Sequence, residues 1–156
     1  LDSLMRVLAN MANIQLGAGL PAGEPTPKKS TVALGDVSGI IPLNSAEIDG
    51  SMAISFPKPV ILDLAKRMLG EEFDSIDDTI KDLTGEITNM VAGGTKRVLS
   101  EHGYDIDMAT PKVITGVNHD IIHHVGDTTI IIPFHLESGD VYMEINFDRG
   151  LQVQVD

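Results

Sequence analysis

Three polar residues, Asp82, Glu86 and Asn89, recur at steps of four and three within a segment of helical periodicity. On a helix that advances by about 100° per residue, their side chains fall within about 60° of one another. They lie about 120° around the helix from its apolar residues, so we expect them to face outward. An amide can donate a hydrogen bond to a water molecule and accept one from it, which suits positioning the water better than removing its proton. The strip therefore offers two carboxylates and one amide to a molecule outside the chain.

Two further residues, Gly93 and Lys96, continue the polar strip, and Gly85 and Gly94 flank it. A glycine inside a helix costs about 1 kcal/mol relative to alanine, so stability alone would not select three of them. Close approach of another backbone or of a partner surface would select them. The geometry leaves a second interpretation open, because a Glu and an Asn one turn apart are most often a solvated face. Helix glycines also serve close packing within a domain.

The helix that carries this strip is predicted to run from about Asp77 to His102. Asp74 and Ser75 offer N-caps, and Gly103 is a typical C-terminal stop. The predicted buried stripe consists of six apolar residues: Ile80, Leu83, Ile87, Met90, Val91 and Val98.

Two more helices are predicted from apolar residues at three- and four-residue steps. The first contains Leu4, Val7, Leu8, Met11 and Ile14. The second begins near Pro59 and ends at Gly70, with Val60, Ile61, Leu64, Ala65, Met68 and Leu69 on its apolar face. Five methionines are spaced as core fillers, which is the role we expect for them: Met5, Met11, Met52, Met68 and Met90. Between the first helix and the first strand, residues 17–30 are predicted to form a loop.

Strands are predicted in adjacent pairs rather than alternating with helices. The expected strands are Thr31–Ile41, Gly50–Phe56, Val113–Val117, Thr129–Leu136 and Val141–Phe147, with a turn at Pro42–Ser45 and a hairpin turn at Ser138-Gly139-Asp140. This order favours an α+β fold in which a mainly antiparallel sheet packs against long helices. The length of 156 residues fits one domain, residues 1–156. The order helix, strand, strand occurs in both halves, and Asn10-Met11 recurs as Asn89-Met90, which indicates a degenerate internal duplication.

The composition excludes several classes of function. Eleven bases against 23 acids give a net charge of −12, which argues against nucleic acid and anionic membrane surfaces as partners. No run approaches the roughly 20 apolar residues of a membrane span, and no basic-then-apolar leader opens the chain. The absence of cysteine excludes a thiol nucleophile and a Cys-ligated metal, and is compatible with the cytoplasm, where we expect the protein. The acidic balance is also ill suited to holding a free phosphate ester without help.

Three histidines, His119, His123 and His124, are the other group with metal-ligating side chains. Pairing at i, i+4 would require a helix, yet these residues lie between strand-like segments. We therefore expect hydrogen-bonded or solvent-facing histidines and no bound metal. The residues Gly93-Gly94-Thr95-Lys96 are similar to a fragment of a phosphate-binding loop, but they lie within the predicted helix and lack the upstream glycine.

A family signature is matched by Asp82-x3-Glu86-x2-Asn89, followed by twenty-one residues and then Pro111. This pattern resembles the signature of the CheC/CheX/FliY phosphatases. Five blocks match members of this family in order: DVSGIIPL at Asp36–Leu43, DGSMAISFP at Asp49–Pro57, AKRMLGEE at Ala65–Glu72, GEITNMVAGGTK at Gly85–Lys96 and PKVITG at Pro111–Gly116. The resemblance covers about residues 30–147 and contains one signature helix, as in the CheX branch, rather than two.

The resemblance implies hydrolysis of the aspartyl phosphate of a CheY-like response regulator in chemotaxis. Carried over by position, Asn89 would orient the attacking water and Glu86 would pair with the regulator's active-site lysine. Asp82, Gly93 and Lys96 would contact the partner, and Pro111 would shape the following strand. The chain itself would bind no cofactor, because the phosphorylated partner supplies Mg²⁺. The net charge of −12 then indicates that the substrate is a whole protein.

The resemblance also bears on assembly and on the first helix. Family members with two signature helices use both, but here Ser3 and Asn10 align while Val7 replaces the acid, so we expect that half to be inactive. A homodimer is implied, for which the terminal strand Val141–Phe147 offers a candidate sheet edge. The alternative is a receiver-domain binding module or adaptor without turnover. The presence of both Glu86 and Asn89 favours catalysis.

Overall fold

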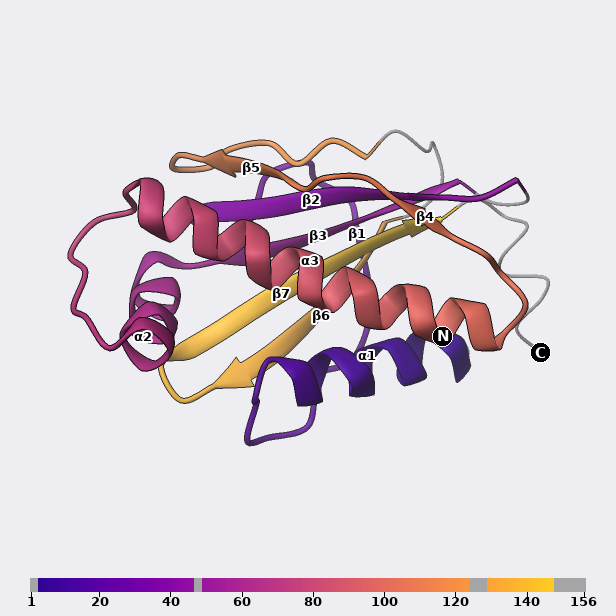
Figure 1. Ribbon diagram of the computed structural model, residues 1–156, viewed down its shortest axis with the longest axis horizontal. Coiled ribbons are helices and arrows are strands. Elements are labelled where there is room, and N and C mark those ends of the chain that lie inside the picture. The colour runs from indigo at the N-terminus through magenta and orange to yellow at the C-terminus, as the bar shows by residue number, and fades with distance from the viewer. Residues whose placement is uncertain (1–2, 47–48, 124–128, 148–156) are drawn as a thin grey trace.

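The computed structural model describes residues 3–46, 49–123 and 129–147 (Figure 1). Within these residues, a seven-stranded antiparallel sheet packs against helices, which confirms the expected α+β fold. Two of the helices lie side by side across one face of the sheet, and the other contacts the longest helix and the last strand. In chain order the elements are α1 (Ser3–Gln15), β1 (Thr26–Lys28), β2 (Val37–Asn44), β3 (Gly50–Phe56), α2 (Lys58–Leu69), α3 (Asp78–Glu101), β4 (Asp107–Met108), β5 (Lys112–Thr115), β6 (Thr129–Leu136) and β7 (Gly139–Phe147).

The last strand, β7, lies in the interior of the sheet. The strand order is β1-β6-β7-β3-β2-β4, and β5 also pairs with β2. β7 pairs with β6 through the predicted hairpin, and on its other side with β3, where Ile54 lies opposite Met143. The expectation that Val141–Phe147 forms a sheet edge is therefore wrong. The pairing partner that covers β7 comes from much earlier in the chain, and no local pattern in the sequence reports it.

Two strand predictions near the start of the sheet also need correction. The segment expected to be a loop, residues 17–30, contains the short strand β1, and the predicted strand Thr31–Ile41 is replaced by β2. The predicted turn at Pro42–Ser45 is wrong as well, because β2 continues through Asn44. Pro42 is tolerated inside this strand because it falls between the residues of β2 that pair with β5 and those that pair with β4.

The long helix α3 follows its prediction closely. The N-cap is Asp77 rather than the expected Asp74 or Ser75, and its side chain accepts a hydrogen bond from the backbone N–H of Ile80 at 3.0 Å. The helix ends at Glu101 with His102 as C-cap, and Gly103 then adopts a φ of +90°, a conformation that favours glycine. The caps fix where the helix begins and ends, and its buried stripe, which includes Ile80, Leu83 and Ile87, fixes the direction of its polar strip.

A glycine in the sheet determines how closely α3 approaches it. Gly39 of β2 lies beneath Thr88 of α3, and a Cβ at Gly39 would come within 2.8 Å of the Thr88 Cβ. Thr88 is fully buried, and its hydroxyl donates a hydrogen bond to the Thr84 carbonyl at 2.7 Å. The absence of a side chain at Gly39 therefore lets the polar helix lie flat on the sheet.

We expect Gly39→Ala to lower the free energy of unfolding by about 1–3 kcal/mol, because the new methyl group overpacks a filled contact. The measurement is chemical denaturation followed by far-UV circular dichroism. Gly93→Ala is the matched control, since a Cβ at Gly93 meets no atom within 4 Å. That variant should gain up to about 1 kcal/mol from helix propensity. Equal stability of both variants would contradict a steric role for Gly39.

Several apolar side chains expected in the core are exposed instead. Val7 and Ile14 of α1, Met90 of α3, and Met68 and Leu69 of α2 all lie at the surface, whereas Met5, Met11 and Met52 are buried as expected. The contact of α1 with α3 is narrow and includes Met11 and Gln15, which a Cβ at Gly94 would meet. Helical periodicity identified the apolar face but overestimated the width that neighbouring elements cover.

The face of the sheet away from the helices carries a buried polar layer under two irregular segments, residues 29–36 and 116–123. His119 bonds through Nε2 to the Ser38 hydroxyl at 2.7 Å, and through Nδ1 to the Gly116 carbonyl at 2.8 Å. His123 contacts the Ser51 hydroxyl and lies 3.0 Å from Glu144. The prediction of hydrogen-bonded histidines is confirmed for these two, and His124 lies outside the described residues.

Candidate functional site

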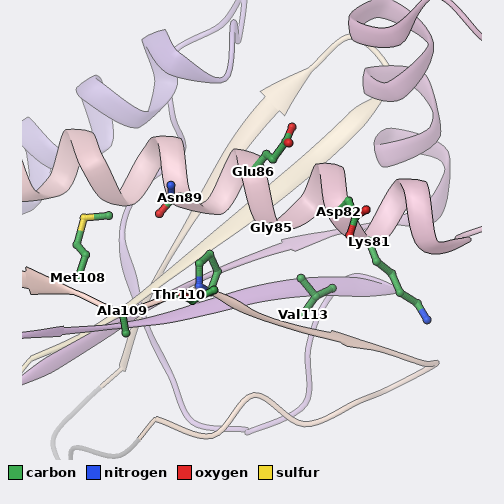
Figure 2. A pocket seen from close by; sticks show the side chains of 10 residues that line it. Lys81, Asp82, Gly85, Glu86, Asn89, Met108, Ala109, Thr110 and Val113 are labelled. Atoms are coloured by element: carbon green, nitrogen blue, oxygen red, sulfur yellow. The ribbon is translucent and has the colours of Figure 1, made fainter.

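The predicted polar strip of α3 forms one wall of a surface pocket of about 640 Å³ (Figure 2). The second wall is the return of the chain from α3 through β4 to β5. The lining residues are Lys81, Asp82, Gly85, Glu86, Asn89, Met108, Ala109, Thr110, Pro111 and Val113. Both walls therefore come from one stretch of chain, and the short connection after Gly103 brings them together.

Asp82, Glu86 and Asn89 all line this pocket, as the helical spacing predicted. All three are exposed, and none of their side chains makes a hydrogen bond or an ion pair with another described residue. Their polar atoms are thus available to an external group. Figure 2 shows Glu86 extending away from Val113, so its carboxylate lies on the outer rim of the site.

The wall opposite α3 is mostly apolar. Met108 ends β4, and Ala109 to Pro111 lead directly into β5, which contributes Val113. A Cβ at Gly85 would lie 3.6 Å from the Val113 Cγ2, so an alanine would fit there while any longer side chain would fill the pocket. Gly85 therefore keeps space between the helix and the second wall.

Lys81 is a pocket residue that the sequence analysis did not identify. It is the base among the lining residues, beside the two acids Asp82 and Glu86, and its ammonium lies 3.9 Å from Asp78. Both partners of that contact are exposed, so the interaction contributes little and leaves Lys81 free to respond to a ligand. Met108, Ala109, Thr110 and Val113 were also missed, because nothing local to them signals a site.

Gly93 and Lys96 continue the strip along α3 but do not line the pocket. The structure separates the roles of the three glycines. Gly94 is needed for packing within the chain, because a Cβ there would meet Met11 and come within 2.7 Å of Gln15. Gly93 faces open space, so packing within the described part of the chain does not require it.

Among the described residues, no group of three or more His, Asp or Glu side chains has the arrangement of a metal site. The acids of the pocket are Asp82 and Glu86, one turn apart. In the same part of the chain, no helix combines the length and the apolar character needed to cross a membrane.

A family model described as "Chemotaxis phosphatase CheX" matches residues 37–135. A curated relative, the CheY-P phosphatase CheX of Thermotoga maritima, is 31% identical over 108 residues, which is 69% of this chain and 65% of the relative. The match thus spans slightly less than two thirds of that relative's length.

Solved structures of similar proteins cover almost the whole chain. A CheC-like superfamily protein from Shewanella sp. PV-4 is 42% identical with a TM-score of 0.78, covering 93% of this chain and 94% of its own. The chemotaxis protein CheX from Vibrio vulnificus is 40% identical with a TM-score of 0.78, covering 93% and 96%. The Borrelia burgdorferi CheX, solved as a complex with CheY, BeF3 and Mg²⁺, shares the fold at 24% identity, with a TM-score of 0.75 and coverage of 94% and 96%. Because the family model covers residues 37–135 and the Vibrio vulnificus CheX is 40% identical, the chain belongs to the CheX family of chemotaxis phosphatases.

Proposed function

We propose that this protein hydrolyses the aspartyl phosphate of a CheY-like response regulator. Asn89 orients the attacking water, and Glu86 pairs with the active-site lysine of the regulator. The observation that carries the proposal is the placement of these two side chains. They lie one turn apart at a surface pocket, exposed and without a partner among the described residues.

The division of labour follows from the chemistry of phosphoryl transfer, which needs an in-line nucleophile and neutralised charge more than covalent help. The Asn89 amide can hold one water by donating to it and accepting from it. The pocket holds one base against two acids, so the negative charge of a phosphoryl group must be neutralised elsewhere. We assign that task to Mg²⁺ and the lysine of the regulator, with no cofactor bound by this chain.

The pocket also suits the proposed lysine contact. A lysine side chain has an apolar stem and a charged head, and it favours sites that offer both environments. Met108 and Val113 provide apolar surface, and Glu86 and Asp82 provide carboxylates on the facing helix. Asp82 then adds a second negative charge one turn before Glu86, while Gly93 and Lys96 border the contact.

The comparisons support the partner and the reaction. The Thermotoga maritima relative is named a CheY-P phosphatase, and the Borrelia burgdorferi protein was solved in a complex with CheY. We extend both to this chain, and place its action in the cytoplasm. We also propose a homodimer joined at a sheet edge, for which the described sheet offers β1 at one edge and β4 and β5 at the other.

The test is phosphate release from a CheY-type receiver domain charged with acetyl phosphate and Mg²⁺. The wild-type protein should accelerate release at substoichiometric concentration, since an enzyme turns over. A protein that binds the charged receiver domain without accelerating release would instead be an adaptor, and the proposed catalysis would be wrong. Sedimentation of the free protein tests the dimer separately.

A further inference from the structure

Three exposed apolar side chains stand beside the proposed catalytic strip. Ile14 is 79% exposed, and Val7 and Met90 are each 42% exposed, although helical periodicity places all three among core residues. Val7 and Ile14 belong to α1 and Met90 belongs to α3, and these two helices lie side by side in Figure 1. We refer to Val7, Ile14 and Met90 as the α1–α3 ridge.

Contacts within the chain show where the ridge lies relative to the site. The side-chain amide of Gln15, the residue after Ile14, donates a hydrogen bond to the backbone carbonyl of Met90 at 3.2 Å. Met90 directly follows Asn89 and comes four residues after Glu86, on the same helix face. At 100° per residue it lies about 140° around α3 from Gly85, which faces the pocket. The catalytic pair is thus flanked by the pocket on one side and by the ridge on the other.

Gly93 adds an independent observation. It lies on the same exposed face, one turn after Asn89, and a Cβ at this position would meet nothing within 4 Å. The chain therefore tolerates a helix-weakening residue where alanine would fit. A surface that must come close to the α3 backbone from outside explains this glycine, whereas packing against the described residues does not.

We propose that the α1–α3 ridge, together with Gly93, is the second half of the surface that docks the response regulator. This inference rests on the proposed function, because the regulator is its occupant. Stable protein interfaces use about 20–30 residues on each side, and the pocket offers ten. Methionine and large apolar groups are favoured in interface cores, where methionine adapts to its partner. The helix α1, which carries no acid at the position of Val7, acts here as a docking platform.

Continuity with the catalytic strip selects the regulator over a second copy of the chain. Met90 is adjacent to Asn89 in sequence, so a copy seated on the ridge would also cover the catalytic side chains. A permanent contact of that kind would block the proposed site. A regulator seated there would engage the ridge and the strip at the same time.

The experiment measures binding of a CheY-type receiver domain held in its activated form with BeF3 and Mg²⁺. The double variant Ile14→Gln, Met90→Gln keeps good helix formers, and we expect it to weaken binding at least tenfold. At saturating receiver domain the rate of phosphate release should stay within about twofold of wild type. Gly93→Ala should raise the melting temperature and weaken binding, which separates docking from stability. The matched control is Val117→Gln, whose side chain is 84% exposed on the segment that covers the other face of the sheet, and it should bind as wild type does.

The outcomes separate this inference from the proposed reaction. Wild-type binding in the double variant and in Gly93→Ala would overturn the ridge as a docking surface. Loss of self-association with unchanged receiver binding would assign the ridge to a second copy and would overturn the inference as well. If the wild-type protein binds the receiver domain but releases no phosphate, the proposal of catalysis is wrong. Weakened binding in the ridge variants would then still support the docking surface.

Discussion

Asn89→Ala should reduce the acceleration of receiver dephosphorylation on the order of 100-fold or more, with binding of the activated receiver domain kept within about threefold. The amide makes no hydrogen bond with another described residue, so its removal leaves the fold intact and deletes the group that orients water. The measurement pairs a phosphate-release assay with titration of the receiver domain held with BeF3 and Mg²⁺. A loss in turnover without a loss in binding is the signature of a water-positioning group.

The control for this variant is Asn10→Ala, which removes an exposed helical asparagine at the matching place of α1. At saturating receiver domain its turnover should stay within about twofold of wild type. If Asn89→Ala retained wild-type turnover, the water would have to be positioned by another group, and the proposed role of Asn89 would be wrong. If Asn10→Ala lost turnover instead, the first half of the chain would hold an active strip.

Glu86→Gln should lower the kcat/KM for the phosphorylated receiver domain by about 10- to 100-fold, with weaker binding as the main cause. The substitution keeps the shape and helix propensity of the side chain and removes its charge, so the effect reports the proposed contact with a lysine. Because the carboxylate lies on the exposed rim, the wild-type affinity should fall with added salt. The variant should show a smaller dependence on salt. Steady-state kinetics at two ionic strengths measure both effects.

Glu101→Gln serves as the matched control, because it removes an exposed acid at the far end of the same helix. Its kinetics and salt dependence should equal those of the wild type. A Glu86→Gln variant with unchanged affinity and unchanged salt dependence would remove the carboxylate from the docking contact. Equal losses in both variants would instead indicate a general effect of net charge.

The features of the fold that sequence reasoning predicted are those with local signals. The helix α3 has a regular apolar stripe and a glycine stop, so its limits were predicted to within a residue or two, although its cap is Asp77 and not Asp74 or Ser75. In the hairpin of β6 and β7, β6 is a run rich in apolar residues, β7 alternates apolar and polar residues, and a tight turn joins them. The strands β1 and β4 contain three and two residues, and they exist only because a longer neighbour pairs with them. The order of the strands in the sheet could not be predicted for the same reason, because the central position of β7 depends on pairing with a distant strand.

The candidate site likewise has one wall that the sequence predicted and one that it did not. One wall follows from helical geometry alone, because Asp82, Glu86 and Asn89 share a face on any regular helix. The opposite wall depends on how the chain returns along β2 after α3, and Pro111 was identified there only through the family resemblance. The exposure of Met90 could not be predicted, since periodicity shows which residues are apolar but not how wide a strip the neighbouring helix covers.

The two walls of the pocket are supplied by a single uninterrupted segment, residues 81–113. A site of this kind is a modular unit: copying one helix and the strand that follows it copies every group the site contains. Gene duplication can therefore double such a site without building a new interface. A single replacement of an acid on the helix would then silence one copy and leave its surface free for another use.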